Sequence, residues 1–306
     1  MSDLLLSGSP VELSHFQGQD FYIKRDDLLS ADFSGNKARK FHFLLQQKPH
    51  QLQRLIAYGS AQANSLLSLA ALCKHQGWQL EYYVNRVPPM VQQSGAASNY
   101  QRAIALGASV ITWPVELSSS QVEGYLQAKA AKDNTSLFVS EGGRIPEAEI
   151  GIAELANELQ AWADKNSIAD WVVVLPSGTG TTALFLQQHL LVPVYTCACV
   201  GGESYLKHQF SSLIKDTSRH PKVINAKQKY HFGKLKLSSY QIWLKLLAET
   251  RIEFELLYDP MAWQVIMPWL QRHRPNTTVV YIHQGGVRGN VTMLPRYQRK
   301  YPLEGE

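Results

Sequence analysis

The sequence is organised around Asp32-Phe33-Ser34-Gly35-Asn36-Lys37-Ala38-Arg39-Lys40-Phe41. The small and polar residues before Lys37 are typical of a tight turn and a helix start, which places Lys37 in the first helical turn. The positive end of a helix disfavours a second positive charge, and Arg39 and Lys40 act in the same direction. These effects favour a neutral amine at Lys37, a nucleophile that can form a Schiff base with an aldehyde. A basic helix start on the protein surface is an equally good interpretation of this stretch alone.

Length and composition describe an ordinary globular protein. The chain has 306 residues, of which 45% are hydrophobic and 18% charged, so it is long enough for two domains or one large α/β unit. Its formal charge of +5 suits anionic small molecules and does not require nucleic acid as a partner. These numbers favour a small-molecule ligand.

The cysteines and the chain start exclude several other classes of protein. Cys73, Cys197 and Cys199 give no disulfide framework, and no Cys or Cys/His cluster has zinc spacing, so we expect no metal site. The first ten residues lack the basic start and long apolar core of a signal peptide. No apolar run is long enough to span a membrane. We therefore expect a cytoplasmic protein without a membrane partner.

Strand-like and helix-like segments alternate along most of the chain. Strands are expected at residues 21–23, 55–58, 80–84, 108–113, 137–139, 171–175, 194–200, 254–258 and 279–282. Helices are expected from Lys37 to about 48, and at 66–73, 98–106, 121–132, 147–162, 183–190 and 240–248. Residues 211–236 are polar, basic and expected to be rich in loops. The alternation predicts βαβ units and a parallel sheet.

A glycine- and threonine-rich turn follows the clearest buried strand, at residues 176–182. Gly178 and Gly180 let the backbone turn sharply and approach a ligand, while hydroxyls and helix N–H groups are donors for a phosphate monoester. No GK[ST] follows, which excludes a nucleotide P-loop, and no spaced GxGxxG supports a dinucleotide. We favour phosphate binding over a plain strand–helix turn.

Two further stretches leave alternatives open. The turn at residues 59–65 also joins a strand to a helix, and its Asn64 can either cap that helix or contact a ligand. Lys24-Arg25-Asp26-Asp27 places charges of both signs side by side. The default interpretation of such a cluster is a set of surface salt bridges.

Taken in order, these pieces resemble the family of pyridoxal-phosphate enzymes that includes 1-aminocyclopropane-1-carboxylate (ACC) deaminase and D-cysteine desulfhydrase. The matching stretches span nearly the whole chain and lie at residues 24–27, 35–40, 98–108, 141–143, 177–182, 258–260 and 283–286. The resemblance implies the tryptophan-synthase-β-like fold of type II pyridoxal-phosphate enzymes, with two three-layer αβα domains and mostly parallel sheets. Residues 1–48 and 150–306 would form the larger, cofactor-binding domain, and residues 49–149 a smaller inserted one.

The resemblance also implies roles for matched residues. Lys37 would hold pyridoxal 5'-phosphate as a Schiff base, and Asn64 would contact the ring hydroxyl. The candidate phosphate-binding residues are Ser177, Gly178, Thr179, Gly180, Thr181 and Thr182. The backbone around Ala63, Asn64 and Ser65 would receive the carboxylate of a small amino-acid substrate. A homodimer is implied as well.

The chain departs from the deaminases at positions that matter for chemistry. Ala63 stands where they have a serine, and Ala262 and Trp263 stand where they have a tyrosine and a glutamate. The glutamate maintains protonation of the pyridine nitrogen, so the chain has no matched partner for that atom. Gln284 is the candidate for one hydrogen bond there.

The remaining family tyrosine falls on Phe232, with Tyr230 nearby as a candidate catalytic residue. Because the matched tyrosine is missing, we do not expect true cyclopropane deamination, a hydrolase reaction. Removal of an α-proton with loss of a β-group is less demanding, since Lys37 can act as the base once it is free. A deaminase or β-eliminating lyase is therefore expected. The alternative is a catalytically reduced protein that binds pyridoxal phosphate or an amino acid without turnover.

Overall fold

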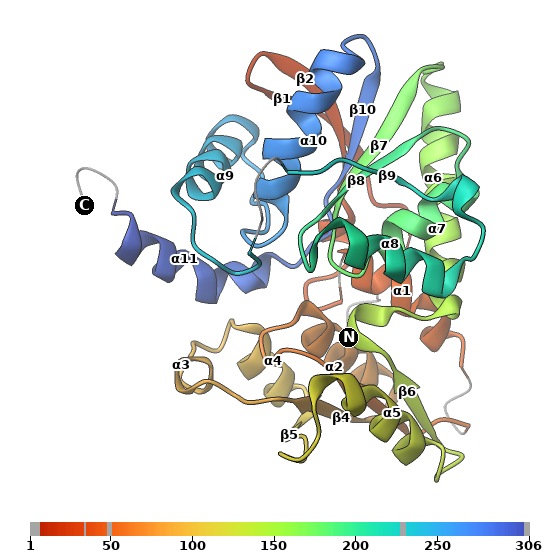
Figure 1. Cartoon of the computed structure of the whole chain (residues 1–306), viewed down its shortest axis with the longest axis vertical. Helices are drawn as coiled ribbons and strands as arrows, with labels where there is room; N and C mark the ends of the chain where they lie inside the picture. Colours follow the sequence, from red (N-terminus) through yellow and green to blue (C-terminus); the bar gives the residue numbers. More distant parts are fainter. Residues whose placement is uncertain (1–6, 34, 48–50, 227–230, 303–306) are drawn as a thin grey trace.

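The computed structural model describes residues 7–33, 35–47, 51–226 and 231–302, which form two sheets with helices on both faces (Figure 1). The larger sheet has six strands in the order β1-β2-β10-β7-β8-β9, and only β1 and β2 pair antiparallel. These strands are β1 (Val11–Phe16), β2 (Gln19–Lys24), β7 (Trp171–Ser177), β8 (Val194–Ala198), β9 (Lys222–Val223) and β10 (Thr278–Ile282).

The smaller sheet has four parallel strands in the order β5-β4-β3-β6. They are β3 (Arg54–Tyr58), β4 (Gln79–Val84), β5 (Ser109–Thr112) and β6 (Ser136–Val139). All four lie within residues 49–149, the segment expected to form the smaller domain, and the strands of the larger sheet lie outside it. The domain limits themselves stay a prediction.

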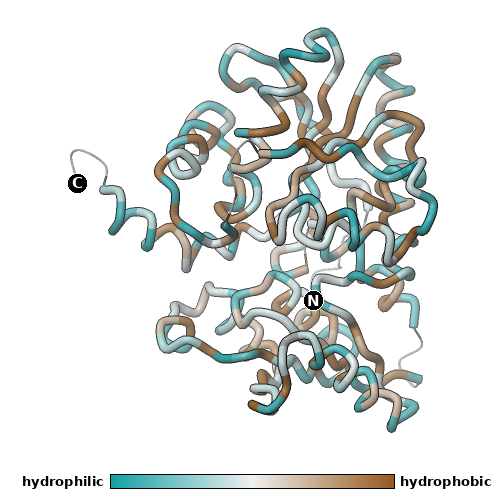
Figure 2. The backbone as a smooth tube through the Cα atoms, viewed as in Figure 1, coloured by the Kyte–Doolittle hydropathy of each residue, from teal (hydrophilic) through white to brown (hydrophobic). Residues whose placement is uncertain are grey.

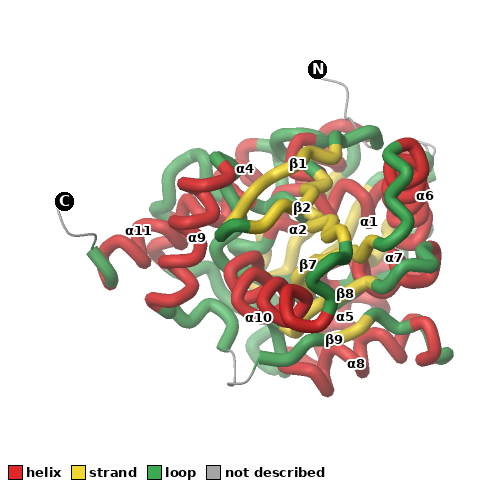
Figure 3. The backbone as a smooth tube through the Cα atoms, turned by 90° about the horizontal axis from the view of Figure 1, so that it is seen from above, coloured by secondary structure: helices red, strands yellow, loops and turns green. Residues whose placement is uncertain are grey.

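Helices cover both faces of the larger sheet (Figure 3). Val173 and Leu175 of β7 pack with α6 (Glu149–Lys165) and α7 (Thr181–His189). Val172 and Val174, on the opposite face, pack with α9 (Leu237–Thr250) and α10 (Asp259–His273). This two-residue alternation is what a strand buried on both faces requires. The result is a three-layer αβα arrangement.

The smaller sheet repeats this arrangement. Leu55 and Ala57 of β3 face the cluster that contains α2 (Asn64–Gln76), while Ile56 faces α5 (Ser119–Ala130). The remaining helices are α1 (Gly35–Leu45), α3 (Pro89–Gln92), α4 (Asn99–Ala105), α8 (Gly202–Leu213) and α11 (Asn290–Lys300). Figure 2 shows that hydrophobic residues are concentrated in the central strands and hydrophilic residues on the outer helices. Each described helix falls short of the length and apolar character needed to cross a membrane.

The strand expected at residues 254–258 is wrong. Phe254 and Glu255 are buried there, but the segment is irregular and leads into α10. Its N–H groups bond to side chains and not to a neighbouring strand: Glu255 N donates to Asp259 Oδ2 at 2.8 Å, and Leu256 N donates to Asn290 Oδ1 at 2.9 Å. The apolar residues therefore reflect burial of an irregular segment.

The surface interpretation of the cluster at residues 24–27 is also wrong for two of its members. Lys24 and Asp26 are 2% and 0% exposed. Arg39 of α1 is 0% exposed, and its guanidinium binds Asp26 Oδ1 at 2.8 Å and Glu158 Oε1 of α6 at 2.7 Å. Partners from two distant helices thus neutralise charges that look like surface residues in the sequence, and this buried network ties α1 to the larger sheet.

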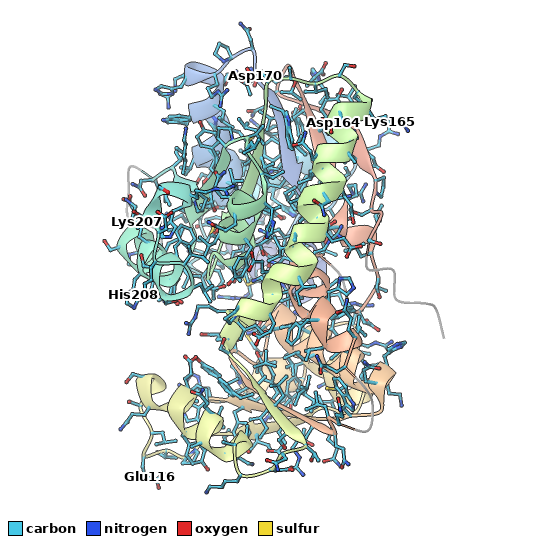
Figure 4. All side chains as sticks on the ribbon, turned by 90° about the vertical axis from the view of Figure 1, so that its right-hand side faces the viewer. Glu116, Asp164, Lys165, Asp170, Lys207 and His208 are labelled. Atoms are coloured by element: carbon cyan, nitrogen blue, oxygen red, sulfur yellow. The ribbon has the colours of Figure 1, made fainter. Side chains whose placement is uncertain are left out.

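We predict that Arg39→Ala lowers the free energy of unfolding by about 3–5 kcal/mol, because it leaves Asp26 buried without its cation. Urea denaturation measures the change. The matched control is Arg274→Ala, which removes a pair with Asp170, a residue that is 59% exposed and lies at the outer edge of the molecule (Figure 4). That variant should lose less than about 1 kcal/mol. Equal losses in both variants would show that the buried network contributes no more than a surface pair.

Candidate active site

A cavity of about 310 Å³ lies where α1, α2, α7 and the carboxyl ends of β7 and β10 meet. This is where open parallel sheets usually bind ligands. All the described residues predicted for the site line it: Lys37, Ala63, Asn64, Ser65, Ser177, Gly178, Thr179, Gly180, Thr181, Thr182 and Gln284. Tyr230 lies outside the described residues. The structure therefore brings the predicted Schiff-base lysine and the predicted phosphate loop into one cavity.

The start of α1 is fixed against the end of β10. Asn36 N donates to Gln284 O at 3.0 Å, and Asn36 Nδ2 donates to Gln284 Oε1 at 2.9 Å. Gly35 has φ +60°, and a Cβ there would lie 1.7 Å from Gln284 O, so only glycine fits. Lys37 follows directly, and its Nζ donates to Asn36 Oδ1 at 3.0 Å.

Burial lowers the pKa of Lys37 to about 8, against the opposing charges of Glu255 and Glu141. The expected lowering of the Lys37 pKa is correct, but its main cause differs from the expected one. Arg39 is engaged with Asp26 and Glu158, and Lys40 Nζ donates to Gly142 O at 2.9 Å. Removal of water around the amine is the largest cause that lowers the pKa and makes the neutral form accessible near pH 8.

The phosphate-loop candidates surround the start of α7. Gly180 has φ +75°, and a Cβ there would lie 2.4 Å from Phe210 Cε1. Thr182 Oγ1 is buried and has no hydrogen-bond partner among the described residues. The Ser177 hydroxyl, by contrast, bonds to Thr196 Oγ1 at 2.6 Å. An unpartnered hydroxyl beside free helix N–H groups fits a bound phosphate, whereas the Ser177 side chain is already engaged elsewhere.

Asn64 does not cap α2 with its side chain. The N-cap is Ala63, without a side-chain hydrogen bond, and Asn64 is the first residue of the helix. Asn64 Oδ1 accepts from Asn99 Nδ2 at 2.7 Å, which orients the amide. Of the two alternatives left open by the sequence, capping is thus wrong, and ligand contact stays a prediction.

Gln284 has both ends of its amide engaged. Its Oε1 accepts from Asn36, and its Nε2 donates to Pro176 O at 2.7 Å. Trp263 and Ala262 are 2% and 0% exposed within an apolar cluster, where Trp263 packs edge-to-face on Phe21 with ring centroids 4.8 Å apart. Neither of these two residues lines the cavity, so they offer the ligand no polar group.

Several lining residues were missed by sequence reasoning: Lys40, Glu141, Tyr205, Glu255 and Tyr258. Glu141 begins one of the stretches that match the family, so this match could have identified it. Glu255 lies in the segment mistaken for a strand and has no motif around it. Burial and the nearby Asp259 raise the pKa of Glu255 to about 8.

Lys37, Asn64 and the phosphate loop together fit pyridoxal phosphate, which has an aldehyde, a ring hydroxyl and a phosphate. No family model matches the chain. A D-cysteine desulfhydrase from Serratia proteamaculans is 28% identical over 203 residues, which are 61% of this chain and 60% of that protein. A putative ACC deaminase from Pyrococcus furiosus is 21% identical over 298 residues, which are 90% and 88% of the two chains. The chain is similar in sequence to D-cysteine desulfhydrases and to a putative ACC deaminase.

Solved structures agree with this relationship at the level of fold. The structure of an ACC deaminase homologue has a TM-score of 0.80 at 18% identity and covers 97% of this chain and 95% of its own. A threonine deaminase has a TM-score of 0.64 at 14% identity, with 91% and 92% covered. The predicted α/β fold of type II pyridoxal-phosphate enzymes is thereby confirmed.

The pKa of Lys37 predicts a pH dependence of stability. Its folded value of about 8 is below the ordinary 10.5, so the folded protein binds this proton less tightly than the unfolded chain, and stability rises with pH between about 8 and 10.5. We predict that Lys37→Met is more stable than the wild type at pH 7 and that this advantage shrinks above pH 8. Urea denaturation across this range measures it.

The matched control is Lys234→Met, which makes the same change at an exposed position. A Lys37→Met difference that does not change between pH 7 and pH 10 would contradict the lowered pKa.

Proposed function

We propose that this protein is a pyridoxal-phosphate-dependent enzyme that deaminates a small amino acid or eliminates a group from its β-carbon. The observation that carries the proposal is the shared cavity, in which a lysine with a lowered pKa faces a glycine–threonine loop at a helix start. The names of the relatives, D-cysteine desulfhydrase and ACC deaminase, support the same class of reaction. The aligned part of the desulfhydrase is 60% of its length, so its substrate is not transferred with its fold.

Each part of the cavity would have a separate task. The bound cofactor supplies an electron sink for the amino acid's α-carbon. Backbone N–H groups of residues 178–182 bind its phosphate, and Asn64 bonds its ring hydroxyl. Backbone N–H groups at the start of α2, residues 63–65, bind the substrate carboxylate. The Lys37 amine accepts the α-proton, which its pKa near 8 suits.

Elimination is the better supported reaction because it needs fewer groups. Opening a cyclopropane requires acid and base groups besides the lysine, and Ala262 is buried in an apolar cluster where the deaminases have a tyrosine. Among the described residues, the aromatic side chains that line the cavity are Tyr205, Phe232 and Tyr258.

Binding without turnover is the second candidate. It is favoured by the replacement of three family side chains, at Ala63, Ala262 and Trp263. Such a protein would hold the cofactor or an amino acid with the same residues but release no product. The proposed homodimer rests on the resemblance alone.

We predict that the protein with added pyridoxal phosphate is yellow and that borohydride reduction abolishes the colour and fixes the cofactor on the peptide that contains Lys37. Peptide mass spectrometry locates it. Lys37→Ala should never form the reducible species, because it has no amine at that position. Lys40→Met, which removes the second lysine of the cavity, should still form it. A colourless wild type that takes up no cofactor would disprove the enzyme and a cofactor-binding protein alike.

We predict that a panel of D- and L-amino acids includes a substrate that releases 2-oxo acid and ammonia, with sulfide in addition from cysteine. ACC should be turned over at least about tenfold more slowly, since no tyrosine reaches the cavity from position 262. Product assays under saturating cofactor measure both. Comparable rates on ACC would contradict the preference for elimination. If no compound gives a product, binding without turnover is the function that remains.

A further inference from the structure

A buried carboxyl in the cavity has one oxygen with no protein partner. Glu255 is 2% exposed and lines the cavity from the irregular segment before α10. Its Oε2 accepts from the N–H groups of Leu257 and Tyr258, both at 2.9 Å. Its Oε1 is buried without a hydrogen-bond partner in the described part of the chain. A buried polar atom left unpaired in a ligand cavity indicates that the ligand is its partner.

Two other polar residues that line the cavity, Asp259 and Gln284, already have partners. Asp259 accepts from the Tyr281 hydroxyl at 2.6 Å with Oδ1 and from Glu255 N at 2.8 Å with Oδ2. Gln284, which the sequence suggested for the pyridine nitrogen, would have to release Asn36 or Pro176 to turn its amide toward a ligand. Glu255 can bond to a ligand without losing any contact.

The position of Glu255 indicates which ligand atom it meets. In pyridoxal phosphate the ring nitrogen lies opposite the carbon that bears the aldehyde, between the hydroxyl edge and the phosphate edge. A Cβ at Gly289 would lie 3.2 Å from Glu255 Oε1 and 3.9 Å from Asn64 Oδ1, so Glu255 is close to the residue expected at the hydroxyl edge. Its Oε2 is bound to Tyr258 N, and the Tyr258 ring lies 3.4 Å from a Cβ placed on Gly178 of the phosphate loop.

We propose that Glu255 Oε1 binds the pyridine nitrogen of the cofactor and shares one proton with it. This rests on the proposed function and supplies the contact that the deaminases place at position 263. Burial and the Asp259 carboxyl raise the pKa of Glu255 to about 8, so a proton is available to the pair at neutral pH, whichever of the two atoms carries it. With Glu255 in this role, Trp263 can pack in the apolar core without a loss of the contact to the nitrogen.

The test compares binding of pyridoxal phosphate with that of 1-deazapyridoxal phosphate, in which C–H replaces the ring nitrogen. The wild type should bind pyridoxal phosphate about 10- to 100-fold more tightly, the range for a hydrogen bond that involves a charged group. Glu255→Leu should bind the two compounds equally. Glu255→Gln can still accept from Leu257 and Tyr258 and so preserves the local fold, and its amide N–H can donate a neutral hydrogen bond to the nitrogen, so it should keep a smaller preference than the wild type. Absorbance titration gives each Kd.

Glu141→Gln is the matched control, since it alters another carboxylate of the same cavity, and it should keep the wild-type preference. Equal binding of both compounds by the wild type, or a full preference in Glu255→Leu, would overturn the assignment while leaving the proposed function intact. Loss of the preference in Gln284→Leu but not in Glu255→Leu would assign the contact to Gln284. Failure of both compounds to form a borohydride-reducible species with Lys37 would overturn the proposed function, and the role of Glu255 with it.

Discussion

The close contact between the start of α1 and the end of β10 is the constraint on which the candidate site depends. Two hydrogen bonds join Asn36 to Gln284, and the backbones approach so closely at Gly35 that no side chain fits there. This contact holds the next residue, Lys37, in a buried position beside the cavity, where loss of water lowers the pKa of its amine. A lysine one turn further along the helix would not be held in the same place.

The geometry of α1 separates two tasks that the sequence presents as one basic run. Residues 37 and 39 lie about 200° apart on a helix, so their side chains leave in opposite directions. Arg39 enters the buried network with Asp26 and Glu158, which anchors the helix to the larger sheet, while Lys37 faces the cavity. A charge network that stabilises the helix thus supports, on its other side, an amine whose protonated form is disfavoured.

Sequence patterns predicted most of what depends on local order. The strand–helix alternation and the turn at residues 176–182 follow from short-range preferences, and the structure places that turn beside Lys37. The predictions that failed concern residues whose structure depends on partners far away in the sequence. Lys24 and Asp26 are buried because Arg39 and Glu158 reach them, and residues 254–258 are irregular because Asp259 and Asn290 accept their N–H groups. Glu255 could not be found for the same reason: its burial beside the cavity depends on long-range packing.

In the proposed enzyme, one cofactor spans the distance between Lys37 and the loop before α7. A crystal structure of the protein soaked with pyridoxal phosphate near pH 8 measures this directly. We predict continuous electron density from Lys37 Nζ through the ring to a phosphate bound by the N–H groups of residues 178–182. A phosphate held elsewhere, or a Lys37 amine that stays unmodified while the cofactor is bound, would contradict it.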